Sequence, residues 1–244
     1  MDNPTLRSIN IIEGKIELLT GLHIGAGNEE IHIGGIDNAI IKHPYTQEPY
    51  IPGSSIKGKL RSLLEWRAGL VGVTDGKPVN TTSLSKFDGT QREQALDICR
   101  LCGVSASSKG DKLIEEVGPT RASFWDSSLT SAWLSERDDR SQLLTEAKFE
   151  NTINRISGTA DNPRQTERVP AGALFDFRVS LKHLVEGDDA LLDLLLVGLK
   201  LLQLDGIGGS GSRGYGKIQF THITLNSETL QERFEKIEPF SSAA

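Results

Sequence analysis

The segment from Tyr50 to Trp66 reads YIPGSSIKGKLRSLLEW and combines a glycine turn, the adjacent serines Ser54 and Ser55 and three basic side chains. Its apolar side chains recur at helical spacing, at Ile56, Leu60, Leu63 and Leu64. The spacing predicts a helix over 54–68, with Ser54 or Ser55 as its N-cap. A helix N-terminus presents unpaired N–H groups and the positive end of a dipole, which suits an anionic oxygen. The segment therefore predicts either a phosphate-binding helix start or a capped helix with a solvated basic face.

This helix is basic, although the whole chain is acidic. The 244 residues carry a formal net charge of −6, which argues against a protein that binds polyanions through its overall charge. Acidic residues gather elsewhere, at 136–139 and 186–193. Within 54–68 the only acid is Glu65, against Lys57, Lys59, Arg61 and Arg67. Such a local basic strip remains compatible with nucleic acid.

The ends of the chain and its cysteines suggest a cytoplasmic protein. The start, MDNPTLRSIN, has neither a basic n-region nor an apolar h-region, so no secretory signal is expected. The most apolar segment, 191–204, is too short to span a membrane. The two cysteines, Cys99 and Cys102, form a CxxC that fits a reducing compartment. Because no second CxxC or histidine pair completes four ligands, we expect a buried thiol pair and no zinc.

The remaining patterns predict an α+β fold with the order β-α-β-β-α-β. A first strand is expected within 11–24 and a short one within 121–126. The clearest strand is 174–183, where apolar and polar residues alternate strictly. Asp188 or Asp189 would cap a largely buried helix that runs to about Leu204, and 217–225 would form the last strand. This order is the ferredoxin-like arrangement that RNA-recognition modules also use.

Two polar segments interrupt this order in what we expect to be a single domain over 1–244. Residues 69–118 have weak periodicity and predict an inserted lid with a short helix around 91–101. Residues 146–172, with Gly158 and Pro163 as breakers, predict a long hairpin that projects from the body. We call this hairpin the thumb.

The glycine-rich stretch 206–216 contains a literal GxGxxG at 209–214. A dinucleotide-binding site requires a strand before this motif and a helix after it, whereas here a helix precedes and a strand follows. The stretch therefore predicts a loop whose backbone N–H groups can approach phosphates, with Arg213 adding charge. A turn that only requires positive φ angles is the alternative.

Two further side chains are candidates for chemistry. Asp37 lies in a loop beside Gly34 and Gly35, where a carboxylate can hold Mg²⁺ or accept a proton. Such an aspartate is also common as a solvated turn residue. His23 ends the first predicted strand and could contact phosphate, transfer a proton or be a partly buried structural histidine. No Ser-His-Asp order or HExxH motif offers competing catalytic machinery.

Four separated blocks resemble the backbone subunit of type III CRISPR effector complexes in the RAMP superfamily, most closely the Csm (type III-A) endoribonuclease subunit. The blocks lie in the family's order between about residues 20 and 220. They read GLHIGAG with GGIDNAII, YIPGSSIKGKLRSLLEW, FENTINRISGTADNPRQTERVPAGALF, and LDGIGGSGSRGYGKI.

The resemblance implies a filament of copies along a CRISPR guide RNA, with other type III effector subunits and a target RNA as partners. The family's catalytic loop aspartate maps onto Asp37, which would cut target RNA at regular intervals with Mg²⁺ or Mn²⁺ and could bind that metal. A non-catalytic guide-RNA scaffold is the alternative, and a stand-alone enzyme that matures guide precursors is a third hypothesis. RNA contacts are expected from His23, Ser54, Ser55, Lys57, Lys59, Arg61, Arg121, Arg155, Arg168, Gly208, Gly209 and Arg213.

Overall fold

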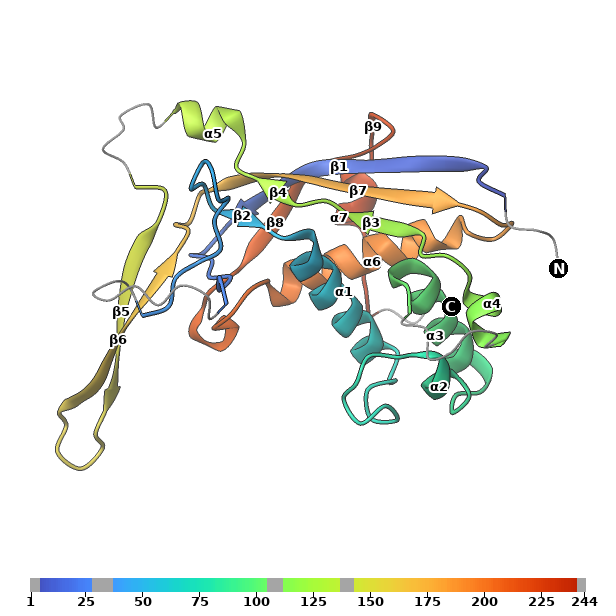
Figure 1. The fold of residues 1–244 in the computed structure, drawn as a ribbon. Helices are drawn as coiled ribbons and strands as arrows, with labels where there is room; N and C mark the ends of the chain where they lie inside the picture. Colours follow the sequence, from blue (N-terminus) through green and yellow to red (C-terminus); the bar gives the residue numbers. More distant parts are fainter. Residues whose placement is uncertain (1–4, 28–36, 105–111, 137–142, 241–244) are drawn as a thin grey trace.

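A five-stranded antiparallel sheet forms the centre of the computed structural model, which describes residues 5–27, 37–104, 112–136 and 143–240. The strand order is β3-β7-β1-β8-β9, and helices cover one face of the sheet (Figure 1). The strands are β1 (Ser8–Leu18), β3 (Ala122–Phe124), β7 (Leu174–His183), β8 (Ile218–Leu225) and β9 (Glu228–Thr229). The covering helices are α1 (Gly53–Arg67) and α6 (Ala190–Asp205).

The predicted alternation places the core between the sheet and these helices. In β7 the residues Phe175 and Phe177 are buried, whereas Asp176 and Arg178 between and beyond them are exposed. The predicted strand 174–183 is confirmed with both bounds. Helix α6 is apolar on nearly every face because it lies between the sheet and α1. Its Gly198 allows this close packing, since a Cβ there would lie 2.7 Å from Cγ of Leu60.

The end of the first strand and the start of α1 differ from the prediction. The first strand stops at Leu18, and the chain then leaves the sheet, so the prediction of a strand to Ile24 is wrong. Helix α1 begins at Gly53 after Pro52, and no side chain of its own segment caps it. Instead, Oδ1 of Asp126 accepts a hydrogen bond from the backbone N–H of Gly53 at 2.8 Å. A carboxylate from a distant strand end thus takes the place predicted for Ser54 or Ser55.

Helix α6 also lacks the predicted cap. Asp189 precedes the helix but makes no side-chain capping bond. The carboxylate of Asp188 turns back instead and accepts hydrogen bonds from the backbone N–H groups of Leu184 and Val185, at 2.8 and 3.1 Å. The first turn is closed by a backbone hydrogen bond of 3.0 Å from the N–H of Leu191 to the carbonyl of Asp188.

The lid consists of short helices that pack at the far end of α1 and α6. They are α2 (Thr81–Leu84), α3 (Gly89–Cys102) and α4 (Lys112–Val117), while residues 105–111 lie outside the described part. Helix α3 confirms the helix predicted around 91–101. Smaller elements complete the body: β2 (Tyr50–Ile51) pairs with β4 (Ser127–Ser128), and α5 (Ser131–Ser135), η1 (Gly211–Arg213) and α7 (Gln231–Glu235) are single turns.

The thumb is a two-stranded hairpin of β5 (Glu146–Ile153) and β6 (Ala160–Arg168). It projects from the end of the sheet opposite the lid (Figure 1). Its outer part is exposed on both strands, whereas Thr166 and Glu167 at its base are buried. Within the described residues, no helix has both the length and the apolar character needed to cross a membrane.

Candidate nucleic-acid interface

Segments far apart in sequence meet where the thumb joins the sheet. Leu22 and Val169 exchange backbone hydrogen bonds of 2.9 and 2.8 Å, which dock segment 20–25 on the thumb base. Asn38 donates its backbone N–H to the carbonyl of Gln165 at 3.2 Å. The backbone N–H of Gly209 reaches the carbonyl of His23 at 2.8 Å. The tertiary structure thus brings together the His23 block, the Asp37 segment, the thumb and the glycine-rich loop.

Asp37 is exposed and held in place by the thumb. Its Oδ2 accepts a hydrogen bond of 2.9 Å from the backbone N–H of Gln165 in β6. The next carbonyl, that of Asn38, accepts the N–H of Glu167 at 2.9 Å. In the part of the chain that the structure describes, Oδ1 of Asp37 has no hydrogen-bond partner, so it can meet a ligand. Gly34 and Gly35 of the same block lie outside the described residues.

Glu167 holds the segment that follows Asp37. Its buried carboxylate accepts hydrogen bonds from Nζ of Lys42 (2.5 Å), Oγ1 of Thr145 (2.7 Å) and the backbone N–H of Ile40 (3.1 Å). Burial by itself would raise the pKa of Glu167, but these bonds outweigh it and hold the pKa below its ordinary value. Sequence reasoning missed this residue because two of its partners lie 125 and 127 positions earlier in the chain.

His23 is oriented by the same glutamate. Its Nδ1 lies 2.7 Å from the backbone carbonyl of Glu167. Because a carbonyl only accepts, Nδ1 is the donor, and the neutral ring keeps its lone pair on Nε2. His23 is half-buried beside the glycine-rich loop. It therefore lies next to Gly208 and Gly209.

The glycine-rich loop packs tightly on segment 20–25. Gly208 has φ +76, and a Cβ there would lie 2.4 Å from the backbone oxygen of His23. At Gly208 the turn itself explains the glycine, because the position requires both a positive φ and a close backbone contact. Gly209 has an ordinary φ, and its N–H already bonds the carbonyl of His23. A phosphate at this loop would have to use other N–H groups.

Glu150 ties the thumb to the glycine-rich loop. It pairs with Arg213 at 2.5 Å and accepts the hydroxyl hydrogen of Tyr215 at 3.0 Å. Burial opposes ionisation of Glu150, but the bonds from Tyr215 and Arg213 prevail and lower its pKa. Burial, followed by the bond to this carboxylate, raises the pKa of Tyr215. Lys148 and Arg168 flank the Tyr215 ring at 4.6 and 5.1 Å from its centroid.

The two thumb arginines predicted to contact RNA differ in their surroundings. Arg168 pairs with Glu146 at 2.6 Å and lies across Gly21, where an added Cβ would meet its side chain at 2.5 Å. Arg155 lies exposed in the hairpin turn. Of the two, Arg155 is the one placed to meet a ligand beyond the body.

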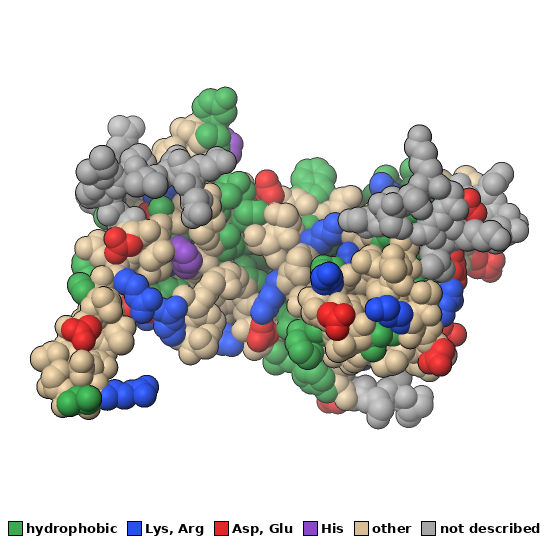
Figure 2. Space-filling view, turned by 60° about the horizontal axis from the view of Figure 1, so that its bottom comes forward, with side chains coloured by type: hydrophobic (Ala, Val, Ile, Leu, Met, Phe, Trp, Pro, Cys, Tyr) green, Lys and Arg blue, Asp and Glu red, His purple; other side chains and the backbone are tan. Residues whose placement is uncertain are grey.

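The residues of α1 predicted to contact RNA also fall into two groups, those without an ion-pair partner and those already paired within the chain. Ser54 is exposed and Ser55 and Lys57 are half-buried, and Lys57 has no ion-pair partner among the described residues. Lys59 pairs with Asp205 at 2.5 Å. The guanidinium of Arg61 is engaged by Glu65 at 2.8 Å and by the backbone carbonyls of Gly103, also at 2.8 Å, and Val79. Arg61 therefore anchors the lid on α1. Figure 2 shows Lys and Arg side chains distributed over one face of the molecule, from the thumb to the helices.

The predicted RNA contact of Arg121 does not fit the structure, because this side chain does not reach the surface. It is only 3% exposed, and its Nε lies 3.3 Å from Oδ2 of Asp188. Its Nη1 donates to the carbonyls of Val117 and Pro119, at 2.7 and 2.6 Å. A side chain enclosed in this way joins the lid to the edge of the sheet and cannot contact RNA in this structure.

The two cysteines are buried in α3. Burial raises the pKa of Cys99 to about 11 and that of Cys102 to about 12, so both thiols are protonated at neutral pH. Across the described ranges, no group of three or more His, Cys, Asp and Glu residues is arranged to hold a metal ion.

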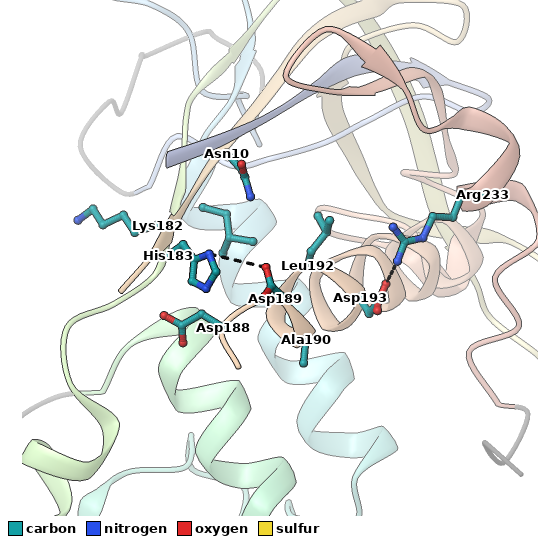
Figure 3. Close-up of a pocket in the computed structure, with 10 residues that line it drawn as sticks. Asn10, Lys182, His183, Asp188, Asp189, Ala190, Leu192, Asp193 and Arg233 are labelled. Atoms are coloured by element: carbon teal, nitrogen blue, oxygen red, sulfur yellow. Dashed lines mark hydrogen bonds and ion pairs between the residues drawn. The ribbon is translucent and has the colours of Figure 1, made fainter. Parts of the chain in front are cut away.

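A separate hollow of about 280 Å³ lies at the other end of β7, beside the start of α6 (Figure 3). His183 faces Asp189 there, with Nδ1 and Oδ1 3.6 Å apart, and Arg233 pairs with Asp193. None of the residues predicted to bind RNA lines this hollow. The candidate RNA-binding residues therefore lie elsewhere, at the thumb end and on α1.

The chain matches a known protein family over most of its length. A family model described as the RAMP superfamily matches residues 15–219. The chain is 41% identical over 234 residues to the CRISPR system Cms endoribonuclease Csm3 of Methanothermobacter thermautotrophicus, covering 91% of this chain and 87% of that protein. It is 39% identical over 218 residues to the protein of the same name from Enterococcus italicus, covering 88% and 91%.

Solved structures show the same fold. A Csm3–Csm4 subcomplex of the type III-A CRISPR-Cas interference complex superposes with a TM-score of 0.54 and 29% identity, over 96% of this chain and 98% of that one. A type III-B Cmr-β complex bound to cognate target RNA gives a TM-score of 0.56 at 17% identity, over 89% and 60% of the chains, and so supports the fold alone. This chain therefore belongs to the RAMP superfamily and is similar over most of its length to proteins named CRISPR system Cms endoribonuclease Csm3.

Proposed function

We propose that this chain is a guide-RNA-binding backbone subunit of a type III CRISPR effector complex and an endoribonuclease that cleaves target RNA at regular intervals. Its partners would be further copies of itself, other effector subunits, the guide RNA and the target RNA. The observation that carries the proposal is the exposed carboxylate of Asp37, fixed on the thumb base in a chain 41% identical to a named endoribonuclease.

The topology supports an RNA-recognition-like palm. The main elements follow the order β1-α1-β3-β7-α6-β8, and all sheet pairs are antiparallel. This order supports the proposal of a ferredoxin-like palm, in which the lid would be inserted after α1 and the thumb before β7. We propose the same division of the chain into one palm with two insertions.

In the proposed reaction, Asp37 accepts the proton of a ribose 2′-OH in the target strand. The 2′-oxygen attacks the adjacent phosphorus in line, a 2′,3′-cyclic phosphate forms, and the P–O5′ bond breaks as the 5′-oxygen takes up a proton. The Gln165 N–H holds Oδ2 of Asp37, which leaves Oδ1 for the substrate. The thumb would splay out one nucleotide so that the backbone can reach this geometry.

Asp37 could bind a divalent cation only if RNA oxygens and waters supplied the remaining ligands. Mg²⁺ in phosphate sites is commonly bound by one or two carboxylates together with substrate oxygens and waters. Asp37 can supply one such carboxylate, whereas Glu167 is already engaged by Lys42, Thr145 and Ile40. We propose Mg²⁺ or Mn²⁺ as the cofactor, and when bound it would offset charge on the pentacoordinate phosphorus.

The guide strand would be held by groups that the fold leaves accessible. These are Ser54, Ser55 and Lys57 at the start of α1, His23, the exposed loop around Gly209 and Arg213, and Arg155 on the thumb. Contacts of Lys59, Arg61 and Arg168 with RNA would have to be made in addition to their intramolecular pairs. Base pairing would read the target sequence, and the protein would read the backbone.

Substitution of Asp37 in a reconstituted complex tests the proposal. Asp37→Ala and Asp37→Asn should both abolish periodic cleavage while target binding persists, and Asn keeps an acceptor for the Gln165 N–H. Cleavage that persists at the same intervals in Asp37→Ala would favour the scaffold alternative. Metal-independent cutting of repeat RNA by the isolated wild-type chain would favour guide-precursor processing instead.

A further inference from the structure

A groove of about 470 Å³ runs along the outer face of α1, between this helix and the loop that leads into the lid. Four residues at a spacing of four form its helical side, Ser54, Gly58, Ser62 and Trp66, and all four are exposed. Val71 and Pro78 belong to the opposite wall. We call these six residues the Trp66 groove. At about 1.5 Å per residue, the stripe from Ser54 to Trp66 spans about 18 Å.

Two residues in this groove are not explained by packing within the chain. Trp66 is 65% exposed, and across the described ranges its ring makes no aromatic or cation–π contact. Gly58 lies in the middle of α1, yet a Cβ at this position would meet nothing within 4 Å. Glycine inside a helix costs about 1 kcal/mol relative to alanine. An open helix surface with no side chain suits close approach by a molecule outside the chain.

The charge of the groove favours an anion. Arg61 and Glu65 form an ion pair at its floor, so they contribute little net charge. Lys57 remains as a positive charge without an ion-pair partner in the described structure. The groove also begins at Ser54, and both Ser54 and Lys57 belong to the proposed RNA-binding surface. It is therefore continuous with that surface.

We propose that the Trp66 groove binds a single-stranded stretch of the guide RNA, with a phosphate near Lys57, the sugar-phosphate chain passing over Gly58, and a base stacked on Trp66. Aromatic side chains that stack on bases and basic groups that hold phosphates are the usual components of single-strand binding sites. The inference rests on the proposed function and extends its RNA track from the start of α1 to its last turn.

The full-length chain can be tested with fluorescein-labelled single-stranded RNA by fluorescence anisotropy. Loss of one stacked base costs about 1–3 kcal/mol, so Trp66→Ala should weaken binding by roughly 5- to 150-fold. Trp66→Phe should restore most of the affinity. Trp125→Ala is the matched control, because Trp125 is 50% exposed, lies with its ring against Arg178 and does not line the Trp66 groove. Its affinity should equal that of the wild type.

Gly58→Ala separates the site from a structural effect. Alanine should raise the free energy of unfolding, since it favours the helix and meets no neighbour, and yet weaken RNA binding. Equal affinity of Trp66→Ala, Gly58→Ala and the wild type would overturn the inference and leave the proposed function intact.

Two other results would also overturn the inference. If Trp66→Ala disrupts self-association of the RNA-free chain in sedimentation velocity, while monomer binding of RNA is unchanged, the groove is a protein interface. If the wild-type chain and its assembled complex bind no RNA, the proposed function falls together with this site.

Discussion

Residues of the same type have different tasks in this molecule, and burial decides which. Lys57 and Arg155 reach solvent, whereas Arg121 is enclosed and paired with Asp188. A charge taken out of water is tolerated only when partners replace the lost hydration. Arg121 has such partners in Asp188 and two backbone carbonyls. Its contribution is therefore to stability.

Removal of the partner of Arg121 should destabilise the fold strongly. Asp188→Ala leaves a buried guanidinium without its counter-ion and two backbone N–H groups without their acceptor, which we expect to cost about 3–5 kcal/mol of unfolding free energy. Asp189→Ala, at the neighbouring position with a side chain 82% exposed, should change it by less than about 0.5 kcal/mol. Urea denaturation of both variants measures the difference, and equal stabilities would contradict this account.

Glu167 should give a pH-dependent stability of predictable sign. Its pKa lies below the ordinary value of 4.5, so the unfolded chain binds its proton more readily than the folded one. The stabilisation is therefore complete above about pH 4.5 and is lost as the pH falls through the lower folded pKa. Denaturation midpoints of the wild type and Glu167→Gln should converge as the pH falls below about 4.5. Parallel curves would show that ionisation of Glu167 contributes nothing to stability.

At the scale of elements, the thumb has two parts with separate tasks. The base, through Glu167 and Gln165, holds the Asp37 segment, and Glu150 links the hairpin to the glycine-rich loop. The outer part, beyond the Glu150–Arg164 pair, makes its contacts within the hairpin and ends at the fully exposed Ile156. A deletion that removes the whole hairpin would therefore also release Asp37.

A shorter truncation separates these tasks. Replacing residues 151–163 by Asn-Gly joins Glu150 to Arg164 through a two-residue turn and keeps Gln165 and Glu167. We expect the shortened chain to unfold at nearly the wild-type temperature, because the removed part is exposed. Periodic target cleavage should be lost in the reconstituted complex, because nothing then splays the RNA. Retention of the same cleavage interval would remove the thumb from the mechanism.

The glycine-rich loop offers a matched pair of substitutions. Gly208→Ala places a Cβ 2.4 Å from a backbone oxygen at a positive φ and should lower stability by about 1–3 kcal/mol. Gly209→Ala meets its nearest atom at 3.5 Å, an ordinary contact, and should be nearly neutral in thermal unfolding. If RNA lies along this loop, Gly209→Ala should still weaken binding. A stable Gly208→Ala variant would contradict the observed packing.

At the scale of the whole molecule, an acidic protein carries a local cationic surface. The net charge of −6 does not prevent RNA binding, because charges beyond about 8–10 Å are screened at physiological ionic strength. Affinity then depends on the few basic groups that contact phosphates, and each releases counterions when it binds.

The salt dependence of RNA binding should count these groups. Lys57→Ala should reduce the slope of log affinity against log salt concentration by about 0.7, the value for one phosphate contact on a single strand. Lys86→Ala, which changes an exposed lid lysine that does not line the Trp66 groove, should leave the slope unchanged. Anisotropy titrations between about 50 and 200 mM salt make the comparison. Equal slopes in both variants would place Lys57 outside the interface.

The sequence by itself determined the elements and the family. Helix α1, strand β7 and the thumb were predictable because their periodicities and breakers are local properties that depend on neighbouring residues. The four motif blocks identified the superfamily and the candidate Asp37. The local patterns were less reliable at the ends of elements, where Asp126 replaced the expected serine caps and β1 ended six residues before Ile24.

Only the tertiary structure decided which residues act together. Glu167 holds Lys42 and Ile40 across more than a hundred residues, Glu150 holds Arg213 and Tyr215, and Arg121 is buried. Such pairings depend on distances in space and on exclusion of water, and neither leaves a periodic trace in the chain. For that reason the sequence could nominate basic residues as RNA ligands, and only the fold could separate those that remain accessible from those that hold the protein together.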